Sequence, residues 1–177
     1  MNSTKIPCKY IMNRDIQNKI IGLSHFLFVL GVSTFSSIYR KRTKYDMYVL
    51  LLIFGIIIMW TVHNGECLIT EHVKRNTRNK EEDMLFLFGG NTIALETVKA
   101  FLLILYLVSI WQLLLRNNYS IYACLWLSIV YIAYIFANQN PRTKTSAYGF
   151  SIIQNITSIT YIAFSAYVIY RLATSRQ

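Results

Sequence analysis

Five side chains of metal-ligating types fall within one short segment of the sequence: His63, Glu66, Cys67, Glu71 and His72. Imidazole, thiolate and carboxylate groups are the ligands that zinc and copper take from proteins. On a continuous helix His63, Cys67 and Glu71 would lie one above another, at i, i+4 and i+8. Gly65 disfavours that helix, and no second ligand set occurs elsewhere in the chain. We therefore expect no metal and no other cofactor, and an interfacial helix over residues 66–80 whose charged side chains face water.

Glu96 and Lys99 stand three residues apart at the start of an apolar stretch, so they share one side of a helix. An ionisable pair in a membrane segment is a candidate for ion or proton relay. A local salt bridge, or a Lys99 whose ammonium group reaches the interface, is the simpler interpretation. Amide side chains in or near the apolar stretches suit hydrogen bonds between helices, each worth about 1 kcal/mol. These amides are Gln112, Gln154 and Asn155.

The sequence lacks the short motifs of common catalytic sites. It contains no Gly-x-Ser-x-Gly, no His-Glu-x-x-His and no glycine-rich phosphate loop. Its three cysteines, Cys8, Cys67 and Cys124, do not have the pattern of a disulfide framework. We therefore expect a protein that is not an enzyme, without catalytic or cofactor-binding residues.

The elements that carry these residues are apolar enough to lie in a membrane. Five stretches contain no Lys, Arg, Asp or Glu: Ile20–Tyr39, Met47–Gly65, Ala100–Leu115, Asn117–Pro141 and Thr145–Tyr170. A helix needs about 20 mostly apolar residues to cross a bilayer, where it satisfies its own backbone hydrogen bonds. The sequence therefore predicts an all-α integral membrane helical bundle with about five transmembrane helices and one interfacial helix.

We expect a single transmembrane helical domain over residues 20–177, preceded by a polar N-terminal arm over residues 1–19. One substantial polar loop covers residues 64–83, and the apolar segment after it is too short to cross a membrane alone. Gly89-Gly90-Asn91 interrupts that segment, so we expect a break there. The expected spans are about 20–39, 46–63, 94–115, 119–138 and 148–170.

Basic residues outnumber acidic ones by 18 to 8, which gives a formal net charge of +10. In a soluble protein this excess would suggest nucleic acid. Here the charges flank the spans, so membrane lipids with anionic headgroups and acidic proteins are the expected partners, and nucleic acid is not. Slightly more basic residues fall on the side of the N-terminus, which favours a cytoplasmic N-terminus. The expected lipid or partner contacts are Arg40, Lys41, Arg42, Lys44, Lys74, Arg75, Arg78 and Lys80.

The segment from Trp60 to Arg75 reads Trp-Thr-Val-His-Asn-Gly-Glu-Cys-Leu-Ile-Thr-Glu-His-Val-Lys-Arg. It resembles small multi-span membrane proteins of large double-stranded DNA viruses. In these proteins an apolar span ends in Trp, and a Glu-Cys pair, an aliphatic-Thr pair and a basic helix follow. The resemblance covers about residues 45–80. It implies a protein of the internal membrane of a virion, beneath or attached to the capsid.

A compact bundle with basic loops and without a catalytic motif suits a structural role. We expect a non-enzymatic protein that anchors other proteins, such as capsid proteins or the subunits of a membrane complex, to the bilayer. Two alternatives stay open. A small-molecule or ion carrier or channel would use polar groups within the spans, and an accessory subunit of a membrane complex, such as a respiratory complex, would have the same sequence character.

Overall fold

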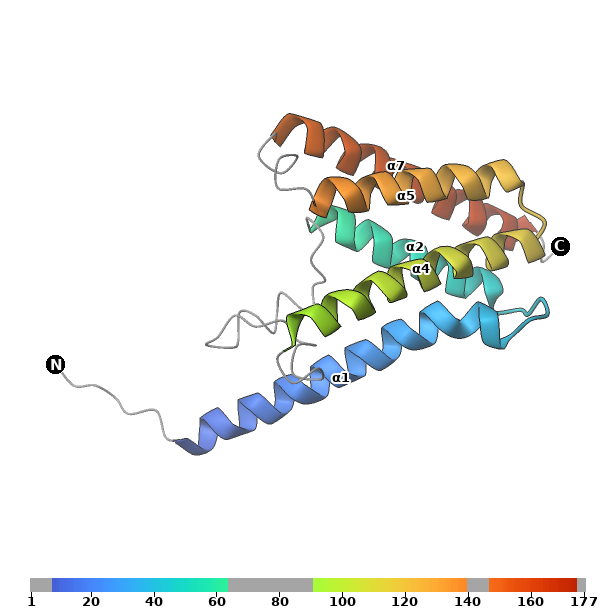
Figure 1. Cartoon of the computed structure of the whole chain (residues 1–177). Coiled ribbons are helices and arrows are strands. Elements are labelled where there is room, and N and C mark those ends of the chain that lie inside the picture. Colours follow the sequence, from blue (N-terminus) through green and yellow to red (C-terminus); the bar gives the residue numbers. More distant parts are fainter. Residues whose placement is uncertain (1–7, 64–90, 140–146, 175–177) are drawn as a thin grey trace.

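Five helices make up the part of the chain that the structure, a computed structural model, describes: residues 8–63, 91–139 and 147–174 (Figure 1). They are α1 (Cys8–Ile38), α2 (Asp46–Val62), α4 (Thr92–Arg116), α5 (Ile121–Gln139) and α7 (Ala147–Thr174). No strand occurs among these residues. Each helix runs opposite to the one before it. The α1–α2 turn, the α4–α5 turn and the end of α7 therefore meet at one end of the bundle, called here the turn end.

The helices have the length and surface of membrane spans. Four segments are long and apolar enough to cross a membrane: Lys19–Ile38, Thr92–Arg116, Ile121–Asn138 and Gly149–Thr174. The apolar α2 has 17 residues, about 26 Å of helix, and packs among the others. Large apolar side chains cover the outside of the bundle, as at Ile129 (60% exposed), Phe136 (70%) and Ile159 (66%). Such a surface suits lipid tails rather than water, and the predicted all-α membrane bundle is confirmed.

The core is built around α2. Its fully buried apolar residues recur every three or four positions, which places them on one helix face: Leu50, Ile53, Phe54 and Ile57. The neighbours of α2 are α7, α4 and α1. Phe54 meets the rings of Tyr161 and Phe164 on α7 edge-on, with ring centres 5.2 and 6.2 Å apart. Aromatic pairs of this geometry add to the energy of burial.

α4 begins directly after the glycine pair. Asn91 has an extended backbone (φ −80°, ψ 103°), and its side-chain oxygen accepts a hydrogen bond from the backbone N–H of Ala94 at 3.1 Å. This N-cap satisfies one of the amides that the first turn leaves without a helical partner. The helix boundary at Asn91 agrees with the expected break. The two glycines and the expected interfacial helix at 66–80 lie outside the described residues.

α1 is longer than the expected span. It runs without a break from Cys8 to Ile38, whereas the sequence suggests a polar arm over residues 1–19 followed by a span. Its 31 residues make about 46 Å of helix, more than the roughly 30 Å of bilayer hydrocarbon. The membrane-crossing segment starts at Lys19, so the helix extends beyond the apolar layer through much of the polar arm.

The helix count places the start of α1 and the end of α7 at opposite ends of the bundle (Figure 1). We predict that reporter tags placed before Cys8 and after Thr174 face opposite sides of the membrane. In sealed vesicles an external protease should remove one tag and spare the other, and detergent should expose both. Removal of both tags from intact vesicles would mean an even number of crossings.

Candidate functional site

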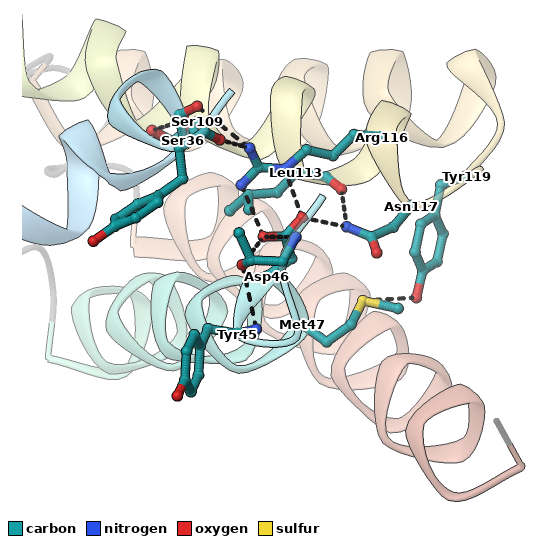
Figure 2. Close-up of polar contacts among 11 residues, drawn as sticks. Ser36, Tyr45, Asp46, Met47, Ser109, Leu113, Arg116, Asn117 and Tyr119 are labelled. Atoms are coloured by element: carbon teal, nitrogen blue, oxygen red, sulfur yellow. Dashed lines mark hydrogen bonds and ion pairs between the residues drawn. The ribbon is translucent and has the colours of Figure 1, made fainter. Parts of the chain in front are cut away.

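A buried ion pair between Asp46 and Arg116 lies at the turn end (Figure 2). Asp46 is the first residue of α2 and Arg116 the last of α4, so each charge has the sign that its helix dipole favours there. Arg116 Nε lies 2.6 Å from Asp46 Oδ2, and Arg116 Nη2 donates a hydrogen bond to Oδ1 at 3.0 Å. The Asp46 side chain is fully buried, and that of Arg116 is 13% exposed.

The Asp46 carboxylate accepts hydrogen bonds from three residues: Thr43, Arg116 and Asn117. Oδ1 also accepts hydrogen bonds from the backbone N–H of Thr43 at 3.2 Å and from its hydroxyl at 2.6 Å. Oδ2 accepts one from Asn117 Nδ2 at 3.0 Å. A carboxylate offers about four lone-pair sites, and four hydrogen bonds reach this one, three at Oδ1 and one at Oδ2, beside the ion-pair contact of Arg116 Nε. The charge of Asp46 is therefore compensated within the protein.

Arg116 also ties the end of α1 to the site. Its Nη1 donates to the backbone oxygen of Ser36 at 3.4 Å and to that of Tyr39. These carbonyls lie at the end of α1, where a helix supplies no N–H partner of its own. The guanidinium therefore satisfies the end of one helix while it neutralises the start of another, and it links α1, α2 and α4.

Asn117 extends the site to α7. Its Nδ2 also donates to the backbone oxygen of Leu113 at 2.8 Å, and its own backbone oxygen accepts from Arg171 Nη1 at 3.3 Å. The guanidinium carbon of Arg171 lies 4.7 Å from the centre of the Tyr119 ring, a cation–π distance. Burial raises the pKa of Tyr119, and the charge of Arg171 acts in the opposite direction. Tyr119 is therefore a neutral packing group at physiological pH.

Hydroxyl groups link α1 to α4, and an indole links α4 to α5. The Ser36 hydroxyl donates to Ser109 Oγ at 2.9 Å, and the Ser109 hydroxyl donates to the backbone oxygen of Ser33. Trp111 Nε1 donates to Ser128 Oγ at 2.7 Å. In a bilayer, hydrogen bonds of this kind contribute about 1 kcal/mol each to helix association.

Similar contacts join α2 to α7. The Ser158 hydroxyl donates to Thr61 Oγ1 at 2.8 Å, and Gln154 Nε2 donates to the backbone oxygen of Thr61. The amide of Gln112 on α4 accepts a hydrogen bond from the Ser37 hydroxyl on α1 at 3.5 Å. Two of the amides picked out from the sequence thus bond between helices, as expected.

The residues expected to bind metal, lipid or partner fall into two groups. The basic residues of the α1–α2 turn are all exposed: Arg40, Lys41, Arg42 and Lys44. His63 follows α2, and its backbone N–H bonds to the backbone oxygen of Met59. Outside the described residues lie Cys67, Glu71, His72, Lys74, Arg75, Arg78 and Lys80. In the described part of the chain, no group of three or more His, Cys, Asp or Glu side chains could hold a metal ion.

Sequence reasoning missed the Asp46–Arg116 pair, although two signals were present. Asp46 is the one acidic residue in positions 16–65, and Arg116 is the one charged residue in positions 100–141. Lone opposite charges at the ends of two spans on the same side are expected to pair. Thr43 also precedes Asp46 by three positions, the capping-box spacing that marks a helix start.

The fold and the site define a polytopic helical membrane protein in which a buried ion pair links the helices at the turn end. Comparisons with protein-family models, curated proteins and solved structures find no match.

We predict that Asp46→Asn and Arg116→Gln each lower the free energy of unfolding by about 3–5 kcal/mol, because each leaves the other charge buried without its partner. The double variant should lose much less than the sum of the two. Unfolding in detergent micelles, followed by loss of helicity, measures all three. Lys41→Gln, which removes an exposed charge from the same end, should change stability by less than about 0.5 kcal/mol. Additive losses would show that the two charges do not depend on each other.

Proposed function

We propose that the chain is a non-enzymatic structural membrane protein that anchors partner proteins to the bilayer. The supporting observation is that buried hydroxyl groups inside the bundle form hydrogen bonds within the protein. Every buried serine and threonine among the described residues has a hydrogen-bond partner within the protein: Ser33, Ser36, Thr61, Ser109, Ser128 and Thr157. Groups that bond to the protein itself are not available to a passing solute.

The charged residues support the same proposal. The carboxylate of Asp46 is paired with Arg116 and hydrogen-bonded to Thr43 and Asn117, so the buried ion pair serves to hold the bundle together. Basic residues flank the spans, and each Lys or Arg near an anionic layer contributes about 1 kcal/mol. We assign partner proteins to the loop group, Lys74, Arg75, Arg78 and Lys80, and diffuse headgroup contact to the exposed turn that includes Arg40 and Lys41.

The setting we propose is the internal membrane of a large DNA virus, because residues 45–80 resemble small membrane proteins of such viruses. Capsid proteins would then be the partners. Anchoring in a membrane complex, such as a respiratory complex, would place the same contacts on the subunits of that complex. Copurification with an icosahedral shell or with an energy-transducing membrane separates these two settings.

We predict that Lys74→Gln/Arg75→Gln weakens retention of partner proteins at low salt, whereas Arg40→Gln/Lys41→Gln, which removes one lysine and one arginine from the α1–α2 turn, does not. Both variants should stay in the membrane, because the apolar spans hold the chain there whatever the salt. High salt should release the partners without extracting the protein, since ionic contacts are screened within about 10 Å at 0.1 M salt. Pull-down from detergent-solubilised membranes measures retention. Unchanged partners in the loop variant would remove the main support for anchoring.

A carrier is the second candidate, and one observation favours it. The Tyr131 hydroxyl on α5 is buried and has no hydrogen-bond partner among the described residues. A buried hydroxyl without a partner costs about 1–3 kcal/mol unless water or a solute satisfies it.

Flux from liposomes decides between the two candidates. We predict that liposomes containing the protein release ions and small solutes no faster than empty ones. Tyr131→Phe should then be neutral or stabilising, whereas Tyr161→Phe, which removes the hydrogen bond to the backbone oxygen of Leu127, should cost about 1 kcal/mol. Selective flux that disappears in Tyr131→Phe would establish the carrier instead.

A further inference from the structure

A cavity of about 860 Å³ opens at the turn end of the bundle. It lies between the α1–α2 turn, the start of α2, the α4–α5 turn and the end of α7. Its volume falls in the range of sites that bind small ligands, about 300–1,000 Å³. These turns connect membrane-crossing helices, so a ligand in the cavity would sit at the boundary between the apolar layer and water.

The cavity is positively charged. Arg42, Lys44 and Arg171 line it, and no acidic residue among the described ones does. Asp46 lies close in sequence, but it is buried and its charge is neutralised by Arg116. The ion pair therefore removes the one carboxylate of this end that could repel an anion, and three cations face the cavity.

Two contacts fix the position of the Arg171 side chain at the cavity. Its guanidinium lies over the ring of Tyr119, and its Nη1 donates to the backbone oxygen of Asn117, which also lines the cavity. A guanidinium carries five N–H donors; one bonds to the backbone oxygen of Asn117, and the side chain is also hydrogen-bonded to the Tyr119 hydroxyl. The guanidinium group is thus fixed in position and keeps N–H donors that can bind two oxygens of one ligand side by side. Arginine binds phosphate groups with this geometry.

The wall of the cavity is partly apolar. Met47, Tyr48 and Leu172 line it beside the cations, and Tyr48 is 47% exposed. Tyrosines at this depth are typical of the aromatic belt at a membrane surface. A soluble anion needs only the cations, whereas a lipid needs an apolar surface next to them. The lining therefore favours a lipid as the occupant.

We propose that this cavity binds the phosphate group of an anionic lipid headgroup, with Arg42 and Arg171 as hydrogen-bond donors and Lys44 as a further positive charge. Basic pockets between transmembrane helices bind such headgroups in other membrane proteins. The proposal goes beyond anchoring, because it specifies one defined lipid site at the turn end. It also separates Arg42 from its neighbours Arg40 and Lys41, which do not line the cavity.

Native mass spectrometry of the purified protein tests this site. The protein is mixed with phosphatidylglycerol or with phosphatidylcholine, and the lipid retained after collisional removal of detergent is counted. We expect the wild type to retain phosphatidylglycerol, and Arg42→Gln/Arg171→Gln to bind it at least about tenfold more weakly. The matched control is Arg40→Gln/Lys41→Gln, which removes two positive charges from the same end outside the cavity and should bind within about twofold of the wild type.

Two further variants separate the effect of the guanidinium groups from the effects of charge and of misfolding. Arg42→Lys/Arg171→Lys keeps the charge and loses the guanidinium fork, so its affinity should lie between those of the wild type and the glutamine variant. If Arg171→Gln unfolds the bundle, the exposed Arg42→Gln alone should still weaken retention. Equal losses in the two double glutamine variants would mean diffuse surface attraction and would overturn the site.

A stability measurement with inorganic phosphate shows whether the ligand is a lipid headgroup or a soluble phosphate. If millimolar phosphate stabilises the lipid-free wild type and not the cavity variant, while phosphatidylglycerol is not retained, the ligand is a soluble phosphate and the lipid assignment is wrong. If neither binds, the proposal fails. These results concern different residues and a different ligand from the partner pull-down with Lys74→Gln/Arg75→Gln, so the lipid site and the anchoring function can fail separately.

Discussion

The ion pair between Asp46 and Arg116 determines how the turn end of the bundle is built. A charge at the edge of an apolar layer costs several kcal/mol in desolvation unless it is paired and hydrogen-bonded. Here two side chains neutralise each other, and they also satisfy the backbone N–H of Thr43 in the α1–α2 turn and a backbone oxygen at the end of α1. Asn117 and Arg171 carry the same network to α7. The ends of four helices, α1, α2, α4 and α7, are therefore joined by one network of hydrogen bonds and charges.

Along the membrane layer the helices are held by different forces. Lipid tails are as apolar as leucine, so burial of apolar surface does not by itself drive helices together there. Close packing and a few directed hydrogen bonds must do so. Ser36 and Ser109 allow α1 and α4 to approach closely and then bond across the contact, while Phe54 fits edge-on between aromatic rings of α7. These directed contacts specify which faces of the helices meet.

The sequence predicts those parts of the structure that depend only on residues close together in the chain. A run of about 20 uncharged residues has few outcomes other than a span, and Asn91 after two glycines marks a helix start because its side chain caps the first turn. The ion pair has no such local cause. Its residues are 70 positions apart, and their meeting depends on which helices are neighbours. In the same way, the placement of Arg171 over Tyr119 follows from the packing of α7 beside α5, which a single sequence does not reveal.

The pairing of α2 with α7 has a consequence for biosynthesis. α2 is the shortest of the described helices, and its most extensive contact is with the last of them. During synthesis α2 leaves the ribosome before α7, so at first its only neighbours from this chain are α1 and later α4. At that stage Thr61 lacks its hydrogen-bond donors Ser158 and Gln154. Until α7 enters, Phe54 also lacks the rings of Tyr161 and Phe164 that it packs against. The contacts of α2 are therefore completed only after α7, the last of the described helices, has been made.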